Sequence, residues 1–243
     1  NGHSVERMPP GQLDFRISHR FGKINSGAYE FFGLDQANTH LSLEYGIAKW
    51  LMMGLGRGTY EKTFDGFAKF TLARQSQGKK RFPLSVSLLY AMAYRTVKSG
   101  GLPWGDYTFS ERASYTGQLL VARRLNQNLS LQLMPTVISR DVAGTEPGLL
   151  WATGAGGRVR LSKRISLNAE YYYCFDRGTY LNSEVFNPLS IGFDIETGGH
   201  VFQLIFTNSV AMIEKGFIGE TTGSWGKGDI HFGFNISRMF DLR

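Results

Sequence analysis

The chain has 243 residues, with 30 glycines, 14% aromatic residues and a net charge of +7. This length suits one large domain or two small ones, and the glycine content suits an all-β chain with many turns. No run of about 18 apolar residues occurs, which excludes a transmembrane helix. The single cysteine, Cys174, excludes an internal disulfide and a zinc cluster. Because no nucleic-acid-binding motif accompanies the basic charge, we expect no nucleic-acid partner.

An alternation of apolar and polar side chains recurs along the chain with a period of two residues. Residues 38–47 are apolar on one face and polar on the other: Leu41, Leu43, Tyr45 and Ile47 against His40, Ser42, Glu44 and Gly46. Residues 188–196 and 229–239 repeat the pattern. This period predicts β-strands with two different faces.

Taken in chain order, the alternating segments predict about twelve strands. They cover residues 12–21, 38–47, 50–57, 66–74, 83–95, 112–124, 129–140, 150–162, 165–175, 188–196, 200–207 and 229–239. Short and long connections alternate between them, and the tight turns lie near residues 48–49, 126–127, 162–163 and 197–199. This rhythm is typical of a closed antiparallel up-and-down transmembrane β-barrel of the bacterial outer membrane.

In barrels of this class the short turns are periplasmic and the long loops are extracellular. An even number of strands then places both termini in the periplasm. We therefore expect residues 1–243 to form one barrel domain, with residues 1–11 as a periplasmic N-terminal segment. Export to the outer membrane requires a signal peptide, which we expect to have been removed.

The alternative to a membrane barrel is a soluble β-sandwich or lipocalin-like barrel, in which the apolar faces point inward. Small soluble barrels rarely need so many strands. The polar faces also carry ionisable side chains of both signs, which suits a hydrated lumen. We predict that these side chains line the lumen: Arg16, Glu44, Lys69, Arg158, Arg160, Glu170, Asp194 and Glu196.

The predicted short turns are basic, whereas the long loops carry charges of both signs. The basic side chains are Lys49, Lys79, Lys80, Arg81, Arg123, Arg124, Lys163 and Arg164. Side chains of this kind at strand ends reach out to the headgroup region, and this interpretation is favoured over an acidic partner. The expected partners are outer-membrane lipids and lipopolysaccharide, and in the second hypothesis below also other outer-membrane or periplasmic proteins.

Several segments resemble the DUF5777 family of Bacteroidota outer-membrane barrels, whose function is uncharacterised. They are residues 13–22 (LDFRISHRFG), 29–36 (YEFFGLDQ), 199–204 (GHVFQL) and 220–238 (ETTGSWGKGDIHFGFNISR). The segments lie near both ends of the chain, so the resemblance extends over its full length. It implies a membrane barrel and supplies no activity, cofactor or catalytic residue.

The residues that could carry catalysis are few. His40, Ser42 and Glu44 share one face of a predicted strand, and a histidine near a serine is an arrangement of outer-membrane phospholipases. Side chains two residues apart on a strand lie about 7 Å from each other, which is too far for a direct hydrogen bond. The histidines show no paired spacing for a metal. We therefore predict no enzyme activity, no catalytic residue, no metal site and no cofactor.

Two long loops hold aromatic side chains that need something to pack against. One covers residues 22–37 and the other residues 208–228. We predict that they cap the pore or contact a partner through the aromatic side chains Tyr29, Phe31, Phe32, Phe217 and Trp225.

Three hypotheses for function follow. A barrel of twelve strands has a backbone diameter of roughly 24 Å, so a lumen lined with side chains would admit small solutes only. The leading hypothesis is a narrow channel or transporter for small polar solutes. The alternative is a structural or accessory subunit of a larger outer-membrane or cell-surface complex. A lipid-directed enzyme that uses His40 and Ser42 is the third.

Overall fold

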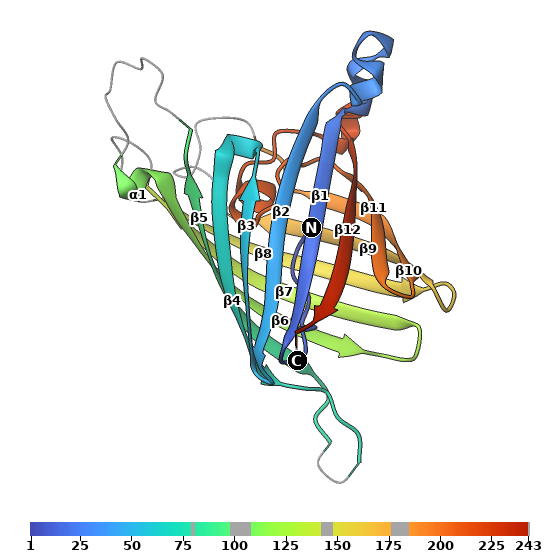
Figure 1. Cartoon of the computed structure of the whole chain (residues 1–243). Coiled ribbons are helices and arrows are strands. Elements are labelled where there is room, and N and C mark those ends of the chain that lie inside the picture. The colour runs from blue at the N-terminus through green and yellow to red at the C-terminus, as the bar shows by residue number, and fades with distance from the viewer. Residues whose placement is uncertain (79–80, 98–107, 142–147, 176–184, 243) are drawn as a thin grey trace.

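The structure, a computed structural model, describes the chain except for residues 79–80, 98–107, 142–147, 176–184 and 243. Its described residues form a closed barrel of antiparallel strands (Figure 1). The strands are β1 (Gln12–Lys23), β2 (Ala37–Ala48), β3 (Leu51–Gly58), β4 (Thr63–Ala73), β5 (Ser85–Arg95), β6 (Ala113–Arg124), β7 (Leu129–Arg140), β8 (Gly148–Arg160), β9 (Ile165–Cys174), β10 (Leu189–Thr197), β11 (His200–Thr207) and β12 (His231–Asp241).

The described parts of the connections and strand ends contain six short helical segments. They are η1 (Ile24–Ser26), η2 (Ala28–Gly33), η3 (Tyr60–Lys62), α1 (Phe109–Arg112), α2 (Glu214–Gly219) and η4 (Trp225–Lys227). No helix among the described residues is both long and apolar enough to cross a membrane.

Each strand pairs with its neighbours in the sequence, and β1 also pairs with β12. Ile17 of β1 lies opposite Leu41 of β2 on one side and Ile236 of β12 on the other. Closure leaves no unpaired strand edge, and every backbone group in the wall can find a partner in the next strand. The prediction of a closed antiparallel barrel with twelve strands is therefore confirmed.

The predicted strands agree with the observed ones within three residues at each end. The largest difference is at β4, which begins at Thr63 rather than at residue 66. The tight turn η3 ends at Lys62, so the chain re-enters the wall directly after it. The four predicted tight turns all join consecutive strands at one end of the barrel (Figure 1).

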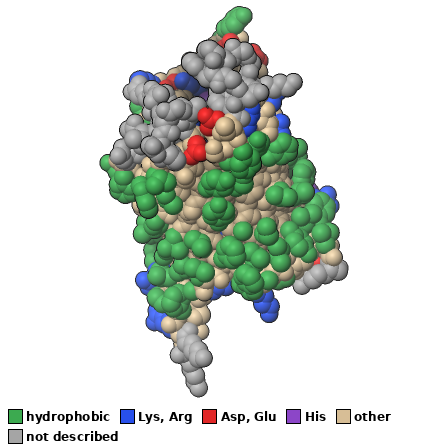
Figure 2. All heavy atoms as spheres, turned by 90° about the vertical axis from the view of Figure 1, so that its left-hand side faces the viewer, with side chains coloured by type: hydrophobic (Ala, Val, Ile, Leu, Met, Phe, Trp, Pro, Cys, Tyr) green, Lys and Arg blue, Asp and Glu red, His purple; other side chains and the backbone are tan. Residues whose placement is uncertain are grey.

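The outer face of the barrel is apolar and its inner face is polar. In β2, Leu41, Leu43 and Tyr45 are exposed on the outside, whereas Glu44 is buried on the inside. Figure 2 shows hydrophobic side chains covering the middle of the wall on the face that it presents. Strands of 8 to 13 residues, tilted in a barrel, match the apolar band of about 25 Å that a membrane requires.

Candidate functional site

The first residues of the chain lie inside the barrel, and this corrects our expectation of a periplasmic segment over residues 1–11. The N-terminus lies at mid-height of the barrel (Figure 1). Gly11 N–H donates to the Gly46 carbonyl oxygen near the short-turn end, and the chain runs from there into the lumen. Its polar groups find partners on the wall, because the interior of the barrel is itself polar. We call residues 1–8 the N-terminal segment.

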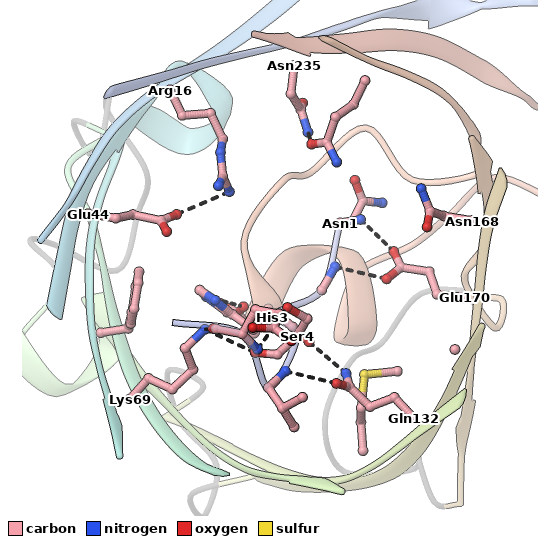
Figure 3. Close-up of a pocket in the computed structure, with 18 of the residues that line it drawn as sticks. Asn1, His3, Ser4, Arg16, Glu44, Lys69, Gln132, Asn168, Glu170 and Asn235 are labelled. Atoms are coloured by element: carbon pink, nitrogen blue, oxygen red, sulfur yellow. Dashed lines mark hydrogen bonds and ion pairs between the residues drawn. The ribbon is translucent and has the colours of Figure 1, made fainter. Parts of the chain in front are cut away.

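Several wall residues hold the N-terminal segment in place. Figure 3 shows Lys69, Gln132 and Glu170 pointing toward it from the strands. The amino nitrogen of Asn1 lies 2.7 Å from Glu170 Oε1, and the Arg20 guanidinium donates to Asn1 Oδ1 at 2.7 Å. Arg20 is 1% exposed, so an acceptor on the segment satisfies a cation that is otherwise shut away from water.

A second part of the chain enters the barrel from the long-loop end. We call residues 208–228 the cap segment. All six residues of its helix α2 are buried, and Phe217 is 1% exposed. The Phe217 ring packs edge-on against Tyr172 of β9, with 5.5 Å between ring centroids. The thiol of Cys174 lies 3.5 Å from the Ile218 carbonyl oxygen. The apolar side of α2 therefore rests on the inner face of β9.

Ion pairs fasten the cap segment to the barrel rim. Lys215 Nζ lies 2.5 Å from Glu61 Oε2 of η3 and 3.1 Å from Glu220 Oε1. The guanidinium of Arg140, at the end of β7, also contacts Glu220 at 2.5 Å. Burial alone would raise the pKa of the Glu61 carboxyl, but Lys215 and Arg95 together hold it below its ordinary value. The cap segment is thus held by charges from η3 and β7, and Arg95 of β5 pairs with Glu61 of η3.

The N-terminal segment and the cap segment meet inside the lumen. His3 Nε2 lies 3.3 Å from Glu214 Oε1 at the start of α2. The His3 ring also packs edge-on against Phe67 of β4, with 4.4 Å between centroids. The two segments therefore enter the lumen from opposite ends and are in contact with each other.

A cavity of about 650 Å³ remains beside the two segments. We call it the lumen cavity. Its lining reaches from Arg124 and Met239, near the short-turn end, to Glu214 and Lys215 of α2. Six of the side chains predicted to line the lumen border it: Arg16, Glu44, Lys69, Arg158, Glu170 and Asp194.

Arg16 and Glu44 lie on the opposite side of the lumen from Gln132 (Figure 3). The Arg16 guanidinium bridges two carboxylates, at 3.1 Å from Glu44 Oε1 and 3.2 Å from Asp14 Oδ2. The remaining two predicted lining residues, Arg160 and Glu196, lie at strand ends and do not border the lumen cavity. Arg160 donates to carbonyl oxygens of the neighbouring turn, and Glu196 accepts from Arg158 at 2.9 Å.

A row of hydrogen bonds crosses four strands of the wall. Arg20 of β1 donates to Asn235 Oδ1 of β12 at 3.0 Å, and Asn235 donates to Gln203 Oε1 of β11 at 2.8 Å. Gln203 in turn donates to Asp194 Oδ1 of β10 at 2.8 Å. Of the residues in this row, only Asp194 was predicted to line the lumen. The neutral amides of Asn235 and Gln203 carry no charge that would distinguish them from other polar residues on the inner face.

The five predicted cap or partner aromatics separate into two groups. Phe217 lies in the lumen, and the Trp225 indole donates to the Leu189 carbonyl oxygen at 2.9 Å. Tyr29, Phe31 and Phe32 of η2 instead point into solvent and are 94%, 59% and 55% exposed. Phe31 and Phe32 have φ of 46° and 54°, in the left-handed region that bulky side chains rarely adopt.

The possible catalytic set shows no serine activated by histidine. His40 Nε2 lies 2.7 Å from Asp65 Oδ1 across β3, and among the described residues no hydrogen bond joins His40 to Ser42. Within the same residues, no group of three or more His, Cys, Asp or Glu side chains is arranged to hold a metal ion.

Comparison with protein families accounts for this architecture. The profile of a membrane-bound β-barrel domain, DUF5777, matches residues 1–240. The chain belongs to this family. The DUF5777 barrel is therefore a membrane protein, as the apolar outer face and polar lumen indicate. No curated protein matches its sequence.

Solved structures share the fold of this DUF5777 chain at very low sequence identity. The NanC porin has a TM-score of 0.57 and 9% identity, over 93% of this chain and 98% of the porin. The KdgM porin, solved with disordered oligogalacturonate, has a TM-score of 0.57 and 8% identity, over 94% and 99%. An outer-membrane channel of Pseudomonas putida F1 has a TM-score of 0.54 and 10% identity, over 99% of both chains.

Asp229 directly follows the cap segment and links Ser224 of that segment to Lys23 of β1. Its carboxylate accepts hydrogen bonds from Lys23 Nζ at 3.0 Å, Ser224 N–H at 3.1 Å and Asn25 Nδ2 at 3.2 Å. These bonds lower the pKa of the Asp229 carboxyl to about 2. A carboxyl with a lowered pKa stabilises the folded state above its ordinary pKa, and this contribution is lost as the pH falls toward 2.

We expect Lys23→Met to raise the pKa of Asp229 toward its ordinary value of 3.8, because the variant removes the strongest donor. The pKa is measured by carbon-13 NMR titration of the carboxyl group in detergent micelles. Lys227→Met is the matched control, since Lys227 lies over the Phe186 ring and makes no contact with Asp229. An unchanged pKa in Lys23→Met would show that this link does not exist in solution.

Proposed function

We propose that this DUF5777 barrel is an outer-membrane channel for small polar solutes, and that its N-terminal and cap segments restrict passage. The observation that carries the proposal is the lumen cavity of about 650 Å³, bordered by Arg16, Glu44, Lys69, Glu170 and Asp194 inside an apolar outer wall. A hydrated path with charges of both signs serves polar solutes, whereas an apolar path would exclude them.

The size of the lumen cavity supports small solutes. Sites for small molecules in proteins usually have volumes of about 300 to 1,000 Å³, and the lumen cavity falls within that range. Its lining begins among strand ends near the short turns and ends at α2. A solute entering from the short-turn end therefore reaches the cap segment before it can leave at the opposite end.

Conductance in planar bilayers tests the proposal. We expect the unmodified chain to give small but measurable single-channel currents. Glu44→Gln removes a negative charge from the lumen cavity and leaves Arg16 less compensated, so the reversal potential in a salt gradient should shift toward anion selectivity. Glu30→Gln is the control, because it is the same replacement on η2, outside the cavity lining.

Two results would overturn this function. One is the absence of current from both the unmodified chain and variants that loosen the cap segment. The other is an equal shift of the reversal potential in Glu44→Gln and Glu30→Gln, which would show that the current does not pass the lumen cavity.

A second candidate function is that of an accessory subunit of a larger outer-membrane complex. It is favoured by Tyr29, Phe31 and Phe32, which are exposed on η2 at the long-loop end. Native purification would test it: a defined partner should accompany the natural chain and be lost when these three aromatics are replaced by serine. A chain that purifies alone in both forms would remove this candidate.

A further inference from the structure

The wall of the lumen holds the N-terminal segment by its main chain. Gln132 Nε2 donates to the His3 carbonyl oxygen at 2.8 Å, and the Val5 N–H donates to Gln132 Oε1 at 3.0 Å. One side-chain amide therefore offers the donor and acceptor that a neighbouring β-strand offers to an extended chain. Because both bonds go to backbone groups, neither requires a particular side chain on the segment.

Two more wall residues bind the main chain on either side of these bonds. Lys69 Nζ donates to the carbonyl oxygens of Ser4 at 3.0 Å and Glu6 at 2.5 Å. The Gly2 N–H donates to Glu170 Oε2 at 2.9 Å. Lys69 is 4% exposed, and hydrogen bonds to charged groups away from water are stronger than bonds between neutral groups. Residues 2 to 6 are thus bound through their backbone by β4, β7 and β9.

Alternate side chains of the N-terminal segment pack against different parts of the wall. The His3 ring packs against Phe67, and Val5 packs against the buried apolar cluster that includes Met134 and Phe217. Main-chain hydrogen bonds that supply affinity, with pockets for every second side chain that supply selectivity, are the features of sites that bind extended peptides.

We propose that the inner wall formed by β4, β7 and β9 is a binding site for extended peptides, and that residues 1–8 occupy it within their own chain. The site prefers a backbone with free N–H groups and an apolar side chain at the position that Val5 holds. This binding does not depend on the proposed channel function, because a peptide can be bound at the wall whether or not the lumen conducts.

A cut chain tests the proposal. A site for a sequence-specific protease is inserted between Met8 and Pro9, and the uncut chain is folded in detergent before the protease is added. Cutting matters because a tethered segment competes with an effective concentration in the millimolar range. A fluorescent synthetic peptide of residues 1–8 is then titrated onto the barrel, and native mass spectrometry follows the cut segment.

We expect either retention of the cut segment or saturable binding of the labelled peptide in its place. Methylation of the Val5 backbone nitrogen should weaken peptide binding about tenfold, because the Val5 N–H can then no longer donate to Gln132 Oε1. Methylation at Arg7, whose N–H makes no hydrogen bond within the described part of the chain, should have little effect.

The wall is tested by Gln132→Leu, which should weaken binding of the unmodified peptide about tenfold. Gln203→Leu is the matched control, because Gln203 bonds wall residues and not the segment. Loss of the cut segment without peptide binding up to millimolar concentration would overturn the proposal. Equal binding of the Val5-methylated peptide, or an equal effect of the two glutamine variants, would overturn it as well.

Discussion

Phe217→Ala is expected to raise the single-channel conductance severalfold over that of the unmodified chain. Phe217 is the largest apolar side chain by which α2 rests on the wall, and its ring lies against Tyr172. Truncating a buried phenylalanine costs about 3–5 kcal/mol. A loss of this size favours states in which the cap segment leaves the lumen, so ions meet less resistance at the long-loop end.

The rate at which Cys174 is chemically modified gives an independent measurement on the same variant. This thiol is 7% exposed and lies beneath the Ile218 carbonyl group. We expect a maleimide to modify it slowly in the natural chain and much faster in Phe217→Ala. Phe109→Ala is the control, since Phe109 is exposed on α1. Higher conductance with no change in the modification rate would argue against release of the cap segment.

Leu43→Arg is expected to lower the free energy of unfolding by about 2–4 kcal/mol, the range for a cation on the lipid face at the bilayer midplane. Leu43 lies in the middle of β2 and is 48% exposed on the outer face. The free energy is measured by reversible urea unfolding in lipid vesicles. An arginine there must be dehydrated or must distort the bilayer to reach water.

Leu161→Arg makes the same replacement in the turn between β8 and β9, where Leu161 is also exposed. Near the membrane interface the cost should fall to about 0–1 kcal/mol. Equal losses of stability at the two positions would contradict our placement of the membrane on the barrel.

The strands of the barrel wall were predictable from the sequence because the environment of each strand residue depends on its position within that strand. A side chain on a strand faces either lipid or lumen, so a period of two marks each strand, and the alternation of loop lengths marks the order. β7, predicted as residues 129–140, is observed over the same range. Glu44 and Lys69 were assigned to the inner face for the same reason, and both border the lumen cavity.

The contents of the lumen were not predictable in this way. The N-terminal segment is polar and aperiodic, and the wall binds it largely through backbone groups, which every sequence has. The only signal in the sequence was the presence of charges such as Lys69 on the inner face, because a buried charge requires a partner. For the cap segment, the apolar residues around Phe217 were visible, but their partner Tyr172 lies 45 residues away on a face that looks polar. Phe31 and Phe32 have left-handed backbone conformations. Bulky side chains rarely adopt these conformations, so their exposure could not be predicted from the sequence.

In the function we propose, segments of the chain itself restrict a channel through this barrel. The most direct test records current through single barrels that carry the protease site between Met8 and Pro9, with the protease added on the short-turn side. We predict a stepwise rise in conductance at the moment when the cut N-terminal segment dissociates from the lumen into the dilute bath. Current that stays the same after the cut segment has dissociated would contradict the proposed restriction.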